Sequence, residues 1–137
     1  MAAKWAVTPS KEETGFLLEA GIIYRDAKNF EAARDVFRGV KALFPQHELP
    51  EILLGTVDFQ AGDFEGADAH YRKALELNPR SALAYAHRGE ACLFRLDKDG
   101  ARTYLKTALT LDPLGEPGKM ARRLVELTDV VTFQRAA

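Results

Sequence analysis

The sequence predicts an all-α fold, an α-solenoid of three helix–turn–helix repeats followed by a C-terminal capping helix. The first observation is that three residue types recur at a spacing of 34 residues, which indicates a repeated unit. The second is that apolar residues between them are spaced by three and four, as on one helix face. The recurring residues are Gly21, Gly55 and Gly89, then Ala33, Ala67 and Ala101, then Pro45, Pro79 and Pro113. A stack of such units presents an extended surface, so we expect it to bind another chain.

This spacing predicts repeats at residues 14–47, 48–81 and 82–115. In each repeat the first helix carries the glycine, and the second helix carries the alanine. A glycine in a helix interior costs about 1 kcal/mol relative to alanine, so its recurrence indicates that two helices approach closely. We expect the alanine to be the counterpart of the glycine across the pair. The proline ends the second helix, because proline cannot continue one.

The connection between the two helices is also repeated. Asn29, Asp63 and Asp97 precede the second helices, and their side chains can cap free backbone N–H groups. Gly62 eases the turn before Asp63. These residues therefore predict where each second helix begins.

Residues 1–13 precede the repeats, and we expect this segment to be partly disordered. Ser10 and Glu13 have the spacing of a capping box, which predicts that the first helix starts near residue 10. Trp5 lies before the capping box. It can dock on the first repeat or lie on a mobile tail, and the sequence leaves both open.

Residues 116–137 are expected to form the capping helix and a tail, after a turn at residues 115–118. One face of this helix is apolar and the opposite face is charged, as expected for a helix that covers the end of a stack. The apolar face is formed by Met120, Leu124, Leu127 and Val131. The charged face is formed by Lys119, Arg122, Arg123, Glu126 and Asp129. Val130 and Phe133 add apolar surface that the packing face of this helix does not use, and this surface could form a homodimer contact.

The repeats resemble the tetratricopeptide repeat, a helix–turn–helix unit whose signature contains Leu-Gly, Tyr, Ala, Phe, Ala and Pro. Repeat 1 carries Gly21, Tyr24, Ala33, Phe37 and Pro45. Repeat 2 carries Leu54, Gly55, Ala67, Tyr71, Ala74 and Pro79. Repeat 3 carries Tyr85, Gly89, Ala101, Ala108 and Pro113. The resemblance implies three repeats in a right-handed superhelix.

Four positions depart from the signature. Glu51 replaces the aromatic residue of repeat 2, and Asp58 and Cys92 replace tyrosines. Arg88 replaces the leucine before Gly89. Asp58 and Arg88 lie on neighbouring first helices, where they can pair or can both reach water.

The resemblance also implies that the first helices line a concave groove that binds peptides. The groove residues are Leu18, Ile22, Arg25, Leu49, Ile52, Thr56, Phe59, Leu83, Ala86, Glu90 and Leu93. One class of the family holds the C-terminal carboxylate of heat-shock chaperones with Lys, Asn and Arg, and those residues are absent from this surface. The groove is predominantly apolar, which suits a hydrophobic segment. Some of these residues can instead pack against residues 1–13 or the C-terminal helix, and Ile52 can turn inward beside Glu51.

Neither the composition nor the motifs of the sequence indicate a catalytic, metal-binding or cofactor-binding site. His47, His70 and His87 lie in different repeats without metal-ligand spacing, and no catalytic constellation or phosphate loop is present. We therefore expect no enzyme activity, metal or cofactor. Cys92 is the only cysteine, which excludes an internal disulfide, and its position on the packing side favours a buried thiol.

The charge and hydropathy of the chain also restrict its partners and location. The net charge of −1 gives no electrostatic footprint for nucleic acid or an anionic membrane. No apolar run approaches the roughly 20 residues that span a bilayer, and the N-terminus lacks a secretory signal stretch. We expect a cytoplasmic protein.

The function indicated by these features is non-enzymatic binding of a protein or peptide with an apolar segment. In size and plan the chain is similar to the type III secretion chaperones of this repeat family, which bind hydrophobic secreted subunits before export. A general scaffold or adaptor for assembly of a multiprotein complex is the alternative. A repeat fragment of a larger regulator or enzyme is a third reading.

Overall fold

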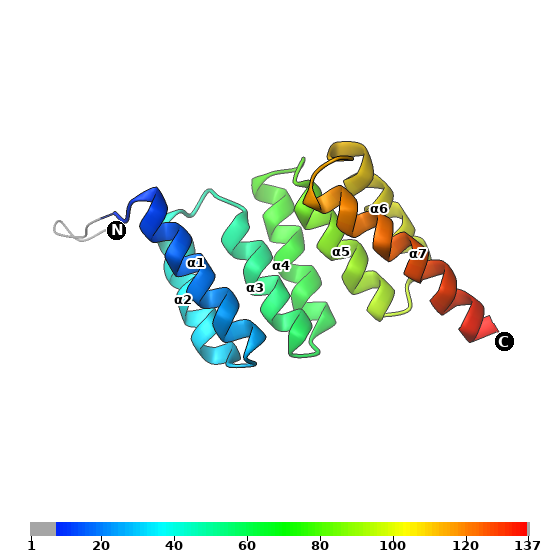
Figure 1. Ribbon diagram of the computed structural model, residues 1–137, viewed down its shortest axis with the longest axis horizontal. Coiled ribbons are helices and arrows are strands. Elements are labelled where there is room, and N and C mark those ends of the chain that lie inside the picture. Colours follow the sequence, from blue (N-terminus) through cyan, green and yellow to red (C-terminus); the bar gives the residue numbers. More distant parts are fainter. Residues whose placement is uncertain (1–7, 137) are drawn as a thin grey trace.

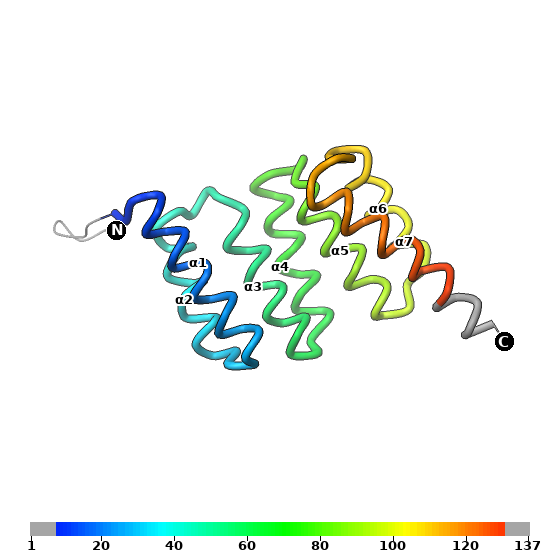
Figure 2. The backbone as a smooth tube through the Cα atoms, viewed as in Figure 1, coloured from blue at the N-terminus to red at the C-terminus, as the bar shows by residue number. Residues whose placement is uncertain are grey.

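The structure, a computed structural model, describes the backbone of residues 8–136 and the side chains of residues 8–130. Its described part contains helices and no strand. The helices are α1 (Lys11–Asp26), α2 (Phe30–Leu43), α3 (Leu49–Gln60), α4 (Phe64–Leu77), α5 (Ala82–Phe94), α6 (Lys98–Leu111) and α7 (Glu116–Ala136). They form three antiparallel pairs stacked in chain order, and α7 packs against α5 and α6 at the end (Figure 1; the backbone alone is drawn in Figure 2). The predicted all-α solenoid with a C-terminal capping helix is confirmed.

The capping box at the start of α1 is present. Ser10 Oγ accepts a hydrogen bond from the backbone N–H of Glu13 at 3.1 Å, and Glu13 Oε1 accepts one from the N–H of Ser10 at 3.2 Å. The helix therefore begins at Lys11 and includes the last residues of the expected N-terminal segment. Trp5 and the predicted disorder lie in residues 1–7, outside the part that the structure describes.

The predicted starts and ends of the second helices are also confirmed. The side chains of Asn29, Asp63 and Asp97 each accept a hydrogen bond from the backbone N–H three residues later. Gly62 has a φ of 88°, a conformation that glycine adopts without a steric cost. Each second helix ends one residue before its C-cap, and each C-cap directly precedes one of the three repeated prolines. These C-caps are Phe44, Asn78 and Asp112.

The repeated glycines make room for large side chains of the partner helix. A Cβ atom added at Gly55 would overlap the ring of Tyr71, which is fully buried. The same contact joins Gly21 to Phe37 and Gly89 to Leu105. The residue one helical turn after each repeated alanine fills the space that the glycine leaves. At Gly89 the predicted alanine contact is also present, since the backbone carbonyl of Ala101 lies 3.3 Å from the added Cβ position. The alanines themselves are fully buried.

The start of α7 differs from the prediction. The helix begins at Glu116, so residues 116–118 are its first turn and not an irregular turn. Pro117 is tolerated there because the N–H groups of a first turn have no partner within the helix. Gly118 allows the close approach of α7 to the end of α6, since a Cβ at this position would meet the carbonyl oxygens of Asp112 and Pro113.

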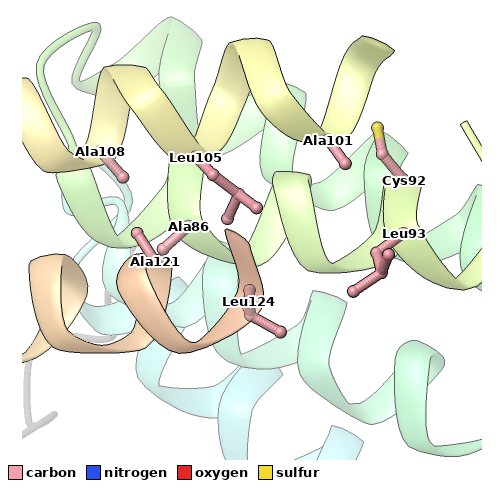
Figure 3. Packing of buried hydrophobic residues seen from close by; sticks show 8 residues of the cluster. All are labelled: Ala86, Cys92, Leu93, Ala101, Leu105, Ala108, Ala121 and Leu124. Atoms are coloured by element: carbon pink, nitrogen blue, oxygen red, sulfur yellow. The ribbon is translucent and has the colours of Figure 1, made fainter. Parts of the chain in front are cut away.

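The buried face of α7 is rotated relative to the prediction. Ala121 and Leu124 pack into the same core cluster as Ala86 of α5 and Leu105 of α6 (Figure 3). Leu127 was expected in the core, but it is 50% exposed, because the buried face continues at Thr128. The five charged residues of the opposite face are exposed, as predicted. The side chains of Val131 and Phe133 lie outside the described residues.

Charged side chains connect the first two repeats. Glu51 of α3 is only 2% exposed and pairs with Lys41 of α2 and, at 2.8 Å, with Nδ1 of His70 of α4. Asp58 accepts a hydrogen bond from Arg34 at 3.1 Å and lies 3.5 Å from Nε2 of the same histidine. We call these five residues the α2–α3–α4 charge cluster. It replaces the aromatic and tyrosine contacts of the repeat signature with ion pairs.

The predicted alternatives for Asp58 and Arg88 were both wrong. Arg88 donates a hydrogen bond to Asp68 of α4 at 2.8 Å and lies over the ring of Tyr104, 4.3 Å from its centroid. The two residues do not pair, because each is held by a residue of the second helix that precedes it, Asp58 by Arg34 of α2 and Arg88 by Asp68 of α4. Neither side chain simply extends into water.

The first prediction concerns the glycine contact. Gly55→Ala should lower the free energy of unfolding by about 1–3 kcal/mol, because the added methyl group overlaps a ring that is packed on all sides. Gly39→Ala is the matched control, since Gly39 lies in α2 and no atom lies within 4 Å of its Cβ position. It should raise stability by up to about 1 kcal/mol. Urea unfolding measures both values, and equal effects of the two substitutions would contradict the packing argument.

The second prediction concerns the hydroxyl of Tyr71. This atom is buried and has no hydrogen-bond partner among the described residues, and Phe37 fills the equivalent place in repeat 1. Tyr71→Phe should therefore raise the free energy of unfolding by about 1 kcal/mol, because a buried unsatisfied hydroxyl is costly. A loss of stability in the same urea experiment would show that the hydroxyl has a partner.

The third prediction concerns the pH dependence of the charge cluster. Burial raises the pKa of Glu51, but hydrogen bonds from Lys41 and His70 outweigh burial and leave this pKa below its ordinary value of 4.5. The ionised carboxylate therefore stabilises the fold above pH 4.5, and this contribution is lost as the pH falls through the lowered pKa.

Glu51→Gln should cost about 1–3 kcal/mol of unfolding free energy at neutral pH. The difference from the native protein should shrink as the pH drops below 4.5. Glu126→Gln on the exposed face of α7 is the control and should have little effect at any pH. Denaturant unfolding across the acidic range measures the difference, and a difference that does not change with pH would contradict the assignment.

Candidate functional site

The predicted groove residues lie on α1, α3 and α5, which lie next to one another along the stack with α7 beyond α5 (Figure 1). We call this side the first-helix surface. Leu18, Ile22 and Leu49 are half-buried at its start, against the core between α1, α2 and α3. Phe59 and Leu83 are half-buried further along, against the core around Tyr71.

Three of the predicted groove residues are core residues, Ile52, Ala86 and Leu93. Ile52 is 1% exposed and packs in the cluster that contains Tyr71, so the inward alternative is the correct one. Ala86 is fully buried because Ala121 and Leu124 of α7 belong to the same cluster. Thr56 and Leu93 are each 7% exposed, and the C-terminal helix shares the cluster of Leu93. The capping helix thus occupies part of the surface that the sequence assigned to a partner.

A pocket with a volume of about 480 Å³ opens where α1 and α3 begin and α2 ends. It brings together Leu18 and Leu49, two predicted groove residues from different repeats. Its walls are mostly apolar, and Lys11 and His47 are its basic members. The complete lining is Pro9, Lys11, Thr14, Gly15, Leu18, Val40, Phe44, His47, Leu49 and Pro50. We call it the α1–α3 pocket.

A polar band crosses the first-helix surface at the C-terminal part of α1. Arg25 donates a hydrogen bond to Thr56 Oγ1 at 2.8 Å, and this hydroxyl donates to the carbonyl of Leu53 at 2.7 Å. Asp26 accepts from Arg25 at 2.9 Å and from Gln60 at 3.2 Å, and these bonds lower the pKa of Asp26. The surface is therefore less apolar than the sequence predicted. The sequence contained a sign of this polar band, since Arg25, Asp26, Thr56 and Gln60 occupy groove positions of neighbouring repeats.

An aromatic cluster lies where α3 and α5 end. The ring centroids of Phe59 and Phe94 are 4.9 Å apart in an edge-to-face arrangement, and Phe64 lies within 5.7 Å of both. Phe94 is 55% exposed, so the cluster presents an apolar face to solvent. The repeat spacing could have identified it, because Phe94 follows Gly89 at a groove position.

Tyr71 of α4 is fully buried against residues of α3 and α5. Burial is the largest cause of a strongly raised pKa at Tyr71, and the charge of Glu90 adds to it. His87 stacks on this tyrosine at 5.7 Å and lies 3.3 Å from Glu90. The arrangement offers apolar contacts and hydrogen-bonding groups to a bound chain.

The three histidines and Cys92, the remaining candidates for catalysis or metal binding, lie apart from one another in the structure. The three histidines lie at the α1–α3 pocket, in the charge cluster and beside Tyr71, and no metal-binding group of acidic, histidine or cysteine residues occurs in the part described. Cys92 is buried as predicted, and burial raises the pKa of its thiol to about 11. Within residues 8–136, no helix is long and apolar enough to cross a membrane.

Solved structures share this fold. The first TPR of Spaghetti (RPAP3), bound to the HSP90 peptide SRMEEVD, is 18% identical with a TM-score of 0.72, covering 93% of this chain and 98% of that chain. The Yersinia enterocolitica type III secretion translocator chaperone SycD is 16% identical with a TM-score of 0.70, covering 90% and 88%. PcrH in complex with the chaperone binding region of PopD is 19% identical with a TM-score of 0.71, covering 90% and 96%. At these identities the likeness shows the fold.

Two family models also match the sequence, whereas a search of curated proteins found no match. The model described as tetratricopeptide repeat matches residues 16–47, and the model described as TPR repeat matches residues 55–93. Together they cover more than half of the chain, which has the three helix pairs and the capping helix described above. The chain belongs to the tetratricopeptide repeat family of protein-interaction modules.

Proposed function

We propose that this protein binds a hydrophobic peptide segment of another protein along its first-helix surface. The observation that carries the proposal is the α1–α3 pocket, in which apolar side chains from two repeats meet around a space of about 480 Å³. Pockets of this size, lined by apolar residues with a few polar groups, are typical ligand sites. The exposed ring of Phe94 supplies a second apolar contact further along the same side of the stack.

The polar band suits the main chain of such a peptide. Arg25, Gln60 and Glu90 are partly or fully accessible and carry donors and acceptors between the two apolar contacts. An extended segment could place alternate side chains in the pocket and on the aromatic cluster while its backbone meets these groups. The Lys, Asn and Arg clamp for a heat-shock carboxylate is absent, so we do not assign that ligand.

A role as a type III secretion chaperone is the more specific form of the proposal. PcrH shares the fold, and its structure contains the chaperone binding region of PopD. In this form the protein is cytoplasmic and covers an aggregation-prone apolar segment. Phe16 and Ile23 on α1 are 70% and 66% exposed, which supports a homodimer contact at that end of the stack.

The fourth prediction tests the surface. Leu49→Asp combined with Phe94→Lys should weaken binding of the partner peptide at least about thirtyfold, the effect of losing one hot spot of about 2 kcal/mol. The new charges suit the helix dipoles, because Leu49 begins α3 and Phe94 ends α5. Leu114→Lys is the control, since it adds a charge at an exposed apolar residue between α6 and α7, away from the pocket lining.

The partner is first identified by affinity capture and mass spectrometry, and binding of its labelled segment is then measured by fluorescence anisotropy. Recovery of one secreted protein, lost with the double variant, supports the chaperone. Recovery of several resident proteins of a complex supports the scaffold or adaptor. Equal affinity of the double variant and the native protein would refute binding at this surface.

A further inference from the structure

We propose that Trp5 of the same chain occupies the α1–α3 pocket. This segment lies outside the described residues, but the chain enters the described region at Thr8 and Pro9, and Pro9 itself lines the pocket. The pocket therefore has an apolar candidate occupant attached to its own edge. The proposal needs no partner, but Trp5 would occupy the pocket that the proposed function assigns to a partner segment, so the two would compete for it.

The length of the connecting chain suits this placement. Pro9 follows Trp5 by four positions, and an extended chain over four positions spans at most about 13–14 Å. The proline disfavours a helical conformation at Thr8, so α1 does not continue backward through it. The sequence distance thus puts the pocket within reach of Trp5.

The chemistry of the pocket suits an indole ring. Leu18, Phe44 and Leu49 offer apolar walls, and Val40 at the base is buried. Lys11 lies at the pocket and can interact favourably with the face of an indole ring. Apart from Lys4, the segment before Thr8 is apolar, and Ala6 and Val7 follow the tryptophan. Burying this ring and the apolar pocket walls together removes both from water.

Trp5 is the only tryptophan, so its fluorescence reports on this residue alone. In the native full-length protein we expect emission at shorter wavelength than in the denatured protein. We also expect quenching by acrylamide to be several-fold weaker than in the denatured protein. Both values should be independent of protein concentration, because the occupant belongs to the same chain.

A matched pair of substitutions locates the docking site. Gly15 lines the pocket and has open space at its Cβ position, so Gly15→Phe can fill the pocket without a backbone clash. This variant should shift the emission toward that of the denatured protein and increase quenching several-fold. Gly39→Phe adds the same side chain at another open position and should leave both values unchanged. Leu49→Asp, which charges the opposite wall, should act like Gly15→Phe.

Circular dichroism verifies that each variant is folded before its fluorescence is interpreted. An exposed tryptophan in the native protein overturns the proposal. So does a protected tryptophan that neither pocket substitution releases, because it would then dock elsewhere. Protection that is lost on dilution would assign the occupant to a second copy and overturns the proposal as well. A protected Trp5 with no partner recovered by affinity capture would leave this inference standing while the proposed function fails.

Discussion

The close approach of the two helices in each repeat is the constraint on which the rest of the structure depends. In every pair a glycine of the first helix accommodates a large buried side chain of the second helix. A side chain at the glycine would separate the helices, and the cores between successive repeats would lose their contacts. The contact thereby fixes which side of each first helix is buried and which side remains available to form the first-helix surface.

The contacts between repeats vary more than the contacts within them. Between repeats 1 and 2, Glu51 and Asp58 are held by basic side chains of α2 and by His70, where the repeat signature has apolar residues. Between repeats 2 and 3, Arg88 reaches Asp68 and Tyr104 instead. Because buried charges need matched partners, these pairs restrict how neighbouring repeats can be combined.

The first-helix surface results from both kinds of contact. Its apolar places lie at the α1–α3 pocket and at the aromatic cluster, and the Arg25–Thr56 hydrogen bond links α1 to α3 between them. α7 covers the part near Ala86, so the surface available to a ligand lies mainly on the first two repeats and on the end of α5. A ligand on this surface contacts groups that are already positioned by the core.

The sequence by itself determined the repeat, the starts and ends of the second helices, and the presence of a capping helix, because glycine, proline and Asn or Asp caps act within a few residues of their own positions. It also identified Leu18 and Leu49 as groove residues, and the structure brings the two together in one pocket. Only the tertiary structure decided that Ile52 and Ala86 are buried. A repeat register specifies the direction of a side chain from its own helix, whereas burial depends on which distant helix, such as α7, packs over it. The partners of Asp58 and Arg88 were undecided for the same reason, since long charged side chains select among several neighbours that only the packed helices bring within reach.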